Sequence, residues 1–273
     1  PRMVDISAAR RRQSSFGSAR KTSIKKLTLM TTLIKLFVSG FAALMLTSCN
    51  FNIQMGQIEG NGNVVTQDLN LDQEFSRVHS SNGWDVILEK GTSPKVIAEV
   101  DENLLEYLDV HYEGSTLRIE STDNSNIGNA TSRVIHVIYT QPLQAIKASS
   151  ASNITATEML TGDKINFDVS SAATVKLDVE IREITADASS AATLSLNGSA
   201  QKLNFDASSA ATINAKDLKA EYCEAEASSA GSIRTYVSKE MNSKASSGGD
   251  IDYWGDPQEV AVAESSGGSI SKK

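Results

Sequence analysis

The sequence has little proline, few aromatic residues and almost no cysteine, and each scarcity narrows the class of protein. Four of the 273 residues are Pro and 5% are aromatic, so Val, Ile, Leu and Ala must fill the core. Turns must come from the Ser, Thr, Asn, Asp and Gly that crowd the second half, as in all-β proteins. The cysteines are Cys49 and Cys223. If Cys49 is lipidated, Cys223 lacks an intrachain disulfide partner and is expected to be a small core residue.

Motifs of enzymes and of metal sites are also lacking. The chain has three histidines and contains no HExxH, GxSxG, phosphate-binding loop or CxxC motif. The glycine-rich nonapeptide of calcium-binding solenoids is absent. We therefore expect no catalytic residue, no metal and no cofactor. Polysaccharide-active β-helices build their clefts from long loops, whereas residues 166–254 are nearly free of loops, so such an enzyme is the alternative.

Negative charge dominates the chain after its first 49 residues. Residues 1–49 hold nine of the 26 Lys and Arg and one of the 33 Asp and Glu, which leaves 17 basic and 32 acidic residues, a net charge of −15. Phosphate backbones are bound by clustered Lys and Arg, so this acidity argues against nucleic acid as a partner. An acidic body favours the solubility of an exported protein.

A secretory signal of the lipoprotein type fills residues 30–48. A lysine near its start is followed by an apolar run from Leu36 to Leu46, too short to span a bilayer comfortably. The run leads into LTSC, which resembles the bacterial lipobox, so we expect Cys49 to be lipidated and to anchor the protein to the membrane. The location is the cell envelope, at the outer membrane or the periplasmic face, with the leaflet left open. The expected organisation is a mis-called upstream segment (1–29), the signal peptide (30–48), a short tether (49–59) and a single domain (60–273).

A repeat with a period near 19 residues fills the second half. The words DVSSAATVKLD, DASSAATLSLN and DASSAATINAK start at residues 168, 187 and 206, and weaker copies surround them. Apolar residues fall on alternate positions, which is the period of a strand. Identical strands at a fixed period stack in register, one coil above the next. The sequence predicts an all-β fold, a right-handed parallel β-helix or solenoid with about 19–20 residues per coil.

Two sets of side chains are predicted to form columns along this solenoid. The second serine of each pair shares the parity of the inward Val, Leu and Ile, which predicts a buried structural column of Ser171, Ser190, Ser209 and Ser229. A leucine at position 190 is then expected to overpack the core. An outward column of alanines favours self-association. The outward parity also carries a candidate binding face of Asp168, Asp187, Asp206, Thr174, Thr193 and Thr212.

The first part of the domain, residues 60–146, is rich in strands but less regular than the repeat coils at 147–273. EGST marks the turn of an inserted antiparallel hairpin. Trp84 and Trp254 are expected to cover core edges, with an exposed sugar platform as the alternative. Glu264 replaces an inward alanine in the last coil, which indicates a polar cap.

The domain resembles the head GIN domain family (DUF2807), auto-transporter adhesins of Bacteroidetes-like bacteria. The likeness is carried by the order of GNGNVVTQDLN, FSRV, GWDVILEKG, DENL and GSTLRIE, and by the close YWGDPQEVAVAESSGGSISKK. This resemblance implies a β-helical fold, a surface or periplasmic location and often a lipoprotein signal. It brings no active-site residues, because none is defined for the family.

These features together predict a lipid-anchored binding or adhesion module of the cell envelope. Flat solenoid faces are expected to contact a surface glycan or protein, and a copy of the same chain is a further candidate partner. Two alternatives stay open: a polysaccharide-active enzyme, whose groove would hold two carboxylates, and a structural envelope protein with no soluble ligand.

Overall fold

The computed structural model describes residues 57–123 and 125–273, which belong to one compact unit, Gly56–Lys273. The upstream segment, the signal peptide, Cys49 and most of the tether lie outside the described residues. No helix within the described ranges is long and apolar enough to cross a membrane.

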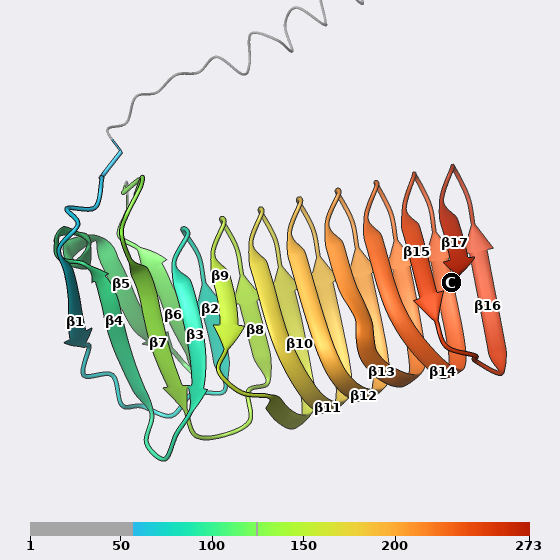
Figure 1. Ribbon diagram of the computed structural model, residues 1–273, viewed down its shortest axis with the longest axis horizontal. Helices are drawn as coiled ribbons and strands as arrows, with labels where there is room; N and C mark the ends of the chain where they lie inside the picture. The colour runs from blue at the N-terminus through green and yellow to red at the C-terminus, as the bar shows by residue number, and fades with distance from the viewer. Residues whose placement is uncertain (1–56, 124) are drawn as a thin grey trace, which may run out of the picture. The chain divides into compact units, whose positions relative to one another are not determined.

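Within these described residues, seventeen strands form one continuous sheet that winds into stacked coils (Figure 1). The opening part contains a 3-10 helix, η1 (Glu102–Tyr107), and nine strands: β1 (Val64–Asp68), β2 (Arg77–Ser80), β3 (Asp85–Lys90), β4 (Lys95–Asp101), β5 (Leu108–Glu113), β6 (Thr116–Ser121), β7 (Arg133–Tyr139), β8 (Ala145–Ala148) and β9 (Asn153–Ala156). The coils that follow are formed by β10 (Leu160–Val169), β11 (Thr174–Ala188), β12 (Thr193–Ala207), β13 (Thr212–Ala227), β14 (Ser232–Ala245), β15 (Asp250–Trp254), β16 (Glu259–Glu264) and β17 (Ser269–Lys272).

Successive coils are parallel and in register, which confirms the predicted solenoid. Val175, Leu194, Ile213 and Ile233 lie directly over one another, and all four are fully buried. Figure 1 shows that each coil rises to a sharp turn at the upper edge, descends on the opposite side and bends at the lower edge. We call the segments that precede the sharp turns the rising wall and those that follow them the descending wall.

Each Ser-Ser-Ala-Ala word forms a two-residue turn, so the predicted inward column of serines is wrong. Ser171 and Ala172 have φ angles of 52° and 61°, and Ala173 N donates to Ser170 O at 3.1 Å. Positive φ at both central residues is typical of a type I′ turn, whose twist suits a tight reversal between strands. The second serine is exposed at the apex in each of these coils: Ser171, Ser190, Ser209 and Ser229.

The physical reason for the error is that the strand alternation does not continue through the reversal. The two central residues of the turn do not belong to either strand. The same parity points inward before and after the turn, since Val169 and Ala173, four residues apart, are both buried. In the repeat coils, small residues occupy the fourth position of the turn, where the two walls meet. The true narrow column therefore consists of Ala173, Ala192, Ala211 and Gly231.

Eight such turns lie one above another, and we call this edge the turn ridge (Figure 1). A residue other than Gly, Asn or Asp in the left-handed region costs roughly 1–2 kcal/mol, so the Ser-Ala turns are strained. Hydrogen bonds between neighbouring turns offset part of this cost, as when Ala172 N donates to Ser190 O at 3.0 Å. The central pairs are Asn82-Gly83, Ser150-Ala151, Ser171-Ala172, Ser190-Ala191, Ser209-Ala210, Ser229-Ala230, Ser247-Gly248 and Ser266-Gly267.

The opening part contributes strands to both walls out of sequence order. β2 and β3 form a coil that lies between β6 and β7 on one side and β8 and β9 on the other, with parallel pairing throughout. The predicted hairpin is confirmed, since β5 and β6 are antiparallel with Glu113 opposite Thr116. β4 runs antiparallel to both β1 and β7.

Large and small side chains alternate along the core. On the rising wall, Phe167, Ala186, Phe205 and Ala225 are in register on successive coils, so each ring fills the space beside an alanine. This alternation lets two narrow walls pack with few aromatic residues. Cys223 is buried as predicted, and burial raises the pKa of its thiol to about 12.

The last coil, β16 and β17, leaves its inner side open. Val260 and Val262 stand in register with the buried Met241 and Ser243, yet they are 46% and 55% exposed. Glu264 lies over Ala245, and its Oε1 accepts a hydrogen bond from Ile270 N at 2.6 Å. An inward charge on an edge strand opposes the addition of another strand, so Glu264 supplies the predicted polar cap.

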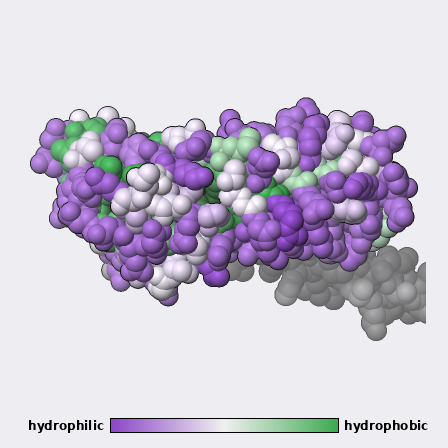
Figure 2. All heavy atoms as spheres, turned by 90° about the horizontal axis from the view of Figure 1, so that it is seen from below, coloured by the Kyte–Doolittle hydropathy of each residue, from purple (hydrophilic) through white to green (hydrophobic). Residues whose placement is uncertain are grey.

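The lower bends carry the hydrophilic surface that dominates Figure 2, which views the molecule from below. Arg182 Nε binds Asp163 Oδ1 at 2.6 Å, and Lys164 Nζ binds Glu183 Oε1 at 3.1 Å, each pair joining neighbouring coils. Exposed ion pairs of this kind add little stability. They do keep this edge polar.

Candidate functional site

The six residues of the predicted binding face form two columns on opposite walls. The aspartates precede the turns and are in register on the rising wall, whereas the threonines follow the turns and are in register on the descending wall. Outward side chains of the two walls point in opposite directions, so the residues do not form one flat face. The columns are Asp168, Asp187 and Asp206 on one wall, and Thr174, Thr193 and Thr212 on the other.

The aspartate column is an acidic strip with one basic neighbour. Strands in a sheet lie about 4.8 Å apart, which brings like charges close together. Partial burial raises the pKa of Asp187 and of Asp206, and adjacent carboxylates raise both further. At one end of the column, Lys147 Nζ binds Asp168 Oδ2 at 2.7 Å.

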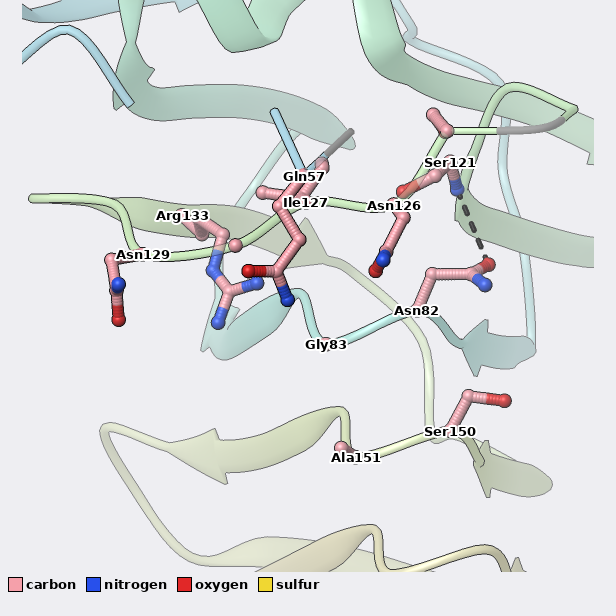
Figure 3. A pocket seen from close by; sticks show the side chains of 12 residues that line it. Gln57, Asn82, Gly83, Ser121, Asn126, Ile127, Asn129, Arg133, Ser150 and Ala151 are labelled. Atoms are coloured by element: carbon pink, nitrogen blue, oxygen red, sulfur yellow. Dashed lines mark hydrogen bonds between the residues drawn. The ribbon is translucent and has the colours of Figure 1, made fainter. Parts of the chain in front are cut away.

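A hollow at the start of the turn ridge was missed by the sequence reasoning. It encloses about 470 Å³ and is lined mainly by amide and hydroxyl groups with a single guanidinium (Figure 3). We call it the amide hollow. The Asn-Gly pair at 82–83, a strong type I′ turn signal, could have located the first turn of the ridge in the sequence. The lining side chains that matter for recognition are Gln57, Asn82, Ser125, Asn126, Asn129 and Arg133.

Backbone pairing between two distant segments fixes one wall of the amide hollow. Ile58 N donates to Asn126 O at 2.9 Å, and Gly128 N donates to Ile58 O at 2.9 Å. Asn129 N also donates to Glu59 Oε2 at 3.0 Å. The loop that supplies the amide side chains is therefore held in place by the segment that supplies Gln57.

The amide of Asn82 is held so that it can donate into the hollow. Its Oδ1 accepts hydrogen bonds from Ser81 Oγ at 2.9 Å and from Ser121 N at 3.4 Å. With the carbonyl oxygen occupied, the Nδ2 protons remain for a ligand. Figure 3 shows Gln57, Asn126 and the guanidinium of Arg133 projecting toward the turn that contains Asn82.

A second hollow, of about 510 Å³, adjoins the first and is acidic. Its carboxylates come from Asp109, Glu120 and Asp123. A ligand that spans the two hollows would contact donors at one end and carboxylates at the other. The two hollows share the lining residues Asn82, Ser121 and Ser125.

One group beside the acidic hollow has the geometry of metal ligands. Asp109, His111 and Glu120 bring one ligand atom each within 4.8 Å of one another. Such a set can hold a divalent cation. However, Arg118 Nη2 already binds Glu120 Oε2 at 3.0 Å, so a metal would compete with a guanidinium. The absence of a resident metal stays a prediction.

The two tryptophans occupy different settings. Trp84 is fully buried behind the turn ridge, as predicted, and its Nε1 donates to Ser121 Oγ at 3.0 Å. Trp254 is partly buried on the descending wall, where Lys216 Nζ lies 5.7 Å from the centre of its ring. Trp84 therefore supports Ser121, which lines both hollows, and offers no platform to a sugar.

The family comparison agrees with this architecture. Residues 74–257 match the family described as "Putative auto-transporter adhesin, head GIN domain" (DUF2807), and the chain belongs to this family. Membership indicates a binding role toward surface partners and a location at the cell surface or envelope. No curated protein matches the chain.

Several solved structures share the fold. A "putative adhesin" from Bacteroides fragilis NCTC 9343 is 16% identical with a TM-score of 0.73, covering 79% of this chain and 100% of the other. A "putative lipid binding protein" from Parabacteroides distasonis ATCC 8503 is 21% identical, with a TM-score of 0.64 and coverage of 80% and 99%. A "putative adhesin" from Parabacteroides merdae ATCC 43184 is 18% identical, with a TM-score of 0.63 and coverage of 80% and 99%. Identities this low establish the common fold alone.

Proposed function

We propose that the protein is a lipid-anchored binding module of the cell envelope that recognises glycans through the amide hollow and the adjoining walls. In this proposal Cys49 carries the acyl chains and holds the solenoid at a membrane surface, on the outer membrane or the periplasmic face. The protein acts by binding and carries out no reaction of its own.

The observation that carries the proposal is the chemistry of the amide hollow. Asn and Gln side chains both donate and accept hydrogen bonds, and serine hydroxyls do the same. Sugar hydroxyls have the same dual character, so a fixed cluster of such groups matches a polyhydroxylated ligand. Gln57, Asn126 and Asn129 are fixed by the backbone pairing of their segments, which limits the entropy lost on binding.

The walls supply a second, weaker contact suited to a polymer. Outward threonines recur on three successive coils of the descending wall, at about the 4.8 Å spacing of strands. A linear glycan lying along the solenoid axis can therefore contact several coils through equivalent groups. The aspartate column of the rising wall is proposed to play the same part toward ligands with positive charge.

A glycan array on residues 50–273, which contain the whole compact unit, tests the proposal. We expect binding to a restricted set of glycans, and loss of most of that binding in an Asn126→Ala, Asn129→Ala double variant. Asn204→Ala is the matched control, because Asn204 is exposed on the rising wall far along the stack. If the wild-type protein binds no glycan on the array, glycan recognition is refuted.

Three alternatives to glycan binding, namely catalysis, self-association and a protein partner, are tested by measurements made beside the array. Turnover of a bound glycan that stops in Asp109→Asn or Glu120→Gln would identify an enzyme using the acidic hollow. A mass that grows with concentration, measured by light scattering without any glycan signal, would favour self-association through the exposed alanines of the turn ridge. Capture of an envelope protein together with array silence would replace glycans by a protein partner.

The anchor is tested separately from the ligand. Mass spectrometry of the N-terminal peptide from native membranes is expected to show a mature protein that begins at acylated Cys49. A Cys49→Ser variant is expected to leave the membrane fraction. An unmodified Cys49 in the membrane-bound protein would contradict the anchor.

A further inference from the structure

We infer that the amide hollow selects a sugar unit bearing a carboxylate, and that Arg133 binds this carboxylate. The inference rests on the proposed glycan-binding function and names the ligand class. Among the described residues that line the hollow, Arg133 alone is charged.

Arg133 is placed by strand geometry rather than by an ion pair. It is the first residue of β7, and Asp85 of β3 pairs with the next residue, Val134. The side chain therefore lies over the turn at Gly83, where a Cβ would sit 3.2 Å from Arg133 Nη1. Gly83 has a φ of +75° and leaves this space for the guanidinium.

The guanidinium is free to bind a ligand. Within the described ranges it forms neither a salt bridge nor a side-chain hydrogen bond, although its side chain is partly buried. An Arg side chain carries five donors in a planar fork that matches the two oxygens of a carboxylate. A partly buried fork without a protein acceptor, open to a hollow, is suited to an anionic ligand.

The charges around the amide hollow favour a ligand with one negative charge over a ligand with two. One guanidinium balances one carboxylate, whereas a phosphate ester carries nearly two charges at neutral pH. Further negative charge is close by, because Glu59 bonds to Asn129 in the wall and Asp123 lines the adjoining acidic hollow. A singly charged uronic or sialic acid unit meets less repulsion there than a phosphate group.

The neutral lining then recognises the rest of the sugar. Asn82 presents its amide protons, and Gln57, Asn126 and Asn129 offer further donors and acceptors. An acidic sugar would make one charged contact and several neutral ones, whereas a neutral sugar would make the neutral contacts alone. We therefore expect an acidic sugar to bind more tightly than a neutral one.

Titration calorimetry on the mature protein tests the inference with matched ligands. The methyl glycosides of glucuronate and galacturonate are compared with their uronate methyl esters, which keep the shape and lose the charge. We expect the acids to bind about 10–100-fold more tightly than the esters, the range for a charge-assisted bidentate contact. Glucose 6-phosphate tests whether the hollow prefers a phosphate group to a carboxylate. We expect it to bind no more tightly than glucose.

Variants assign the effect to Arg133. Arg133→Gln is expected to remove the preference for acid over ester, and Arg133→Lys to retain part of it. Arg182→Gln is the control, because Arg182 lies at the lower edge and is paired with Asp163. Thermal unfolding checks that each variant is folded.

The outcomes separate this inference from the proposed function. Equal binding of acid and ester by the wild-type protein, or an acid preference that survives in Arg133→Gln, would overturn the role of Arg133 while glycan binding stands. Tighter binding of the phosphate than of the uronate would overturn the carboxylate assignment. Absence of binding to every sugar, together with array silence, would remove the proposed function itself.

Discussion

The repeat coils from β10 onward and the opening strands β1–β9 form the same two walls by different means. From β10 to β14, each strand pairs with the one that follows it along the chain, and a Ser-Ser pair recurs at every turn of the repeat coils. In the opening part, β2 lies between β6 and β8, so neighbours in space are far apart in sequence. Regular stacking yields flat walls, whereas the irregular connections of the opening part yield both hollows described above.

The largest expected effect tests how the repeat coils depend on their rare aromatic residues. Phe205 is buried between Ala186 and Ala225, which are too small to fill the space it would leave. Phe205→Ala is expected to lower the free energy of unfolding by about 3–5 kcal/mol. Urea denaturation measures the loss, and Asn204→Ala, an exposed neighbour, is expected to stay within about 0.5 kcal/mol.

The next effect tests the corrected inward column. Ala192 is buried where the walls meet, so Ala192→Leu is expected to overpack the core and cost about 1–3 kcal/mol. Ser190 is exposed at the apex of the same turn, so Ser190→Leu is expected to cost less than about 1 kcal/mol. Thermal unfolding of the two variants side by side checks this, and equal losses would restore the inward assignment of the serines.

A smaller effect comes from exchanging turn sequences between the two regions. Replacing Ser190 and Ala191 by the Asn-Gly pair found at 82–83 relieves strain in the left-handed region, but the new glycine raises the entropy of the unfolded chain. The double substitution is expected to stabilise the coil by about 1 kcal/mol. Chemical denaturation of the double variant measures it, and a clear loss of stability would show that the Ser-Ala turns are not strained.

The two regions are also expected to respond to pH in opposite directions. In the opening part Asp101 is fully buried, and hydrogen bonds from the backbone N–H of Thr131, then of Gly62 and Ser132, hold its pKa below the usual 3.8. Its contribution to stability is present above pH 4 and is lost as the pH falls through the lowered pKa. In the coils the raised pKa of Asp187 means that ionisation disfavours the folded state at neutral pH, and this penalty disappears as the pH falls through that pKa.

Asparagine variants separate the two responses. Asp101→Asn is expected to be less stable than the wild type at pH 7, with the difference vanishing only well below pH 4. Asp187→Asn is expected to be slightly more stable at pH 7, with the difference vanishing at a higher pH than for Asp101→Asn. Urea midpoints between pH 2 and pH 7 measure both, and responses of the same sign would contradict the contrast between the regions.

The same contrast explains what could be predicted from the sequence. Parallel stacking followed from the fixed period of the repeat, and the burial of Leu194 and Ile213 followed from their alternation. The turns were misassigned because Ser and Ala are unusual at positions of positive φ, and no glycine marks most of these reversals. Because the turns were misassigned, the aspartates and the threonines were also predicted to share one face.

The amide hollow lay beyond sequence reasoning for a different reason. Its lining comes from the start of the described chain, the turn after β2, the loop before β7 and the turn before β9. No local pattern links Gln57 with Asn126, because the pairing of Ile58 with Ile127 is a single isolated bridge between distant segments. Arg133 gave no signal either, since a lone arginine at a strand start is ordinary on a protein surface.

The open architecture of the coils has a consequence for how such proteins can vary in length. Each repeat coil bonds only to its two neighbours, and the step from one turn to the next is 19 residues where the words are most alike. Inserting one such unit would therefore lengthen the molecule by about 4.8 Å without altering the amide hollow. The number of coils therefore sets the distance between the amide hollow and the far tip of the stack.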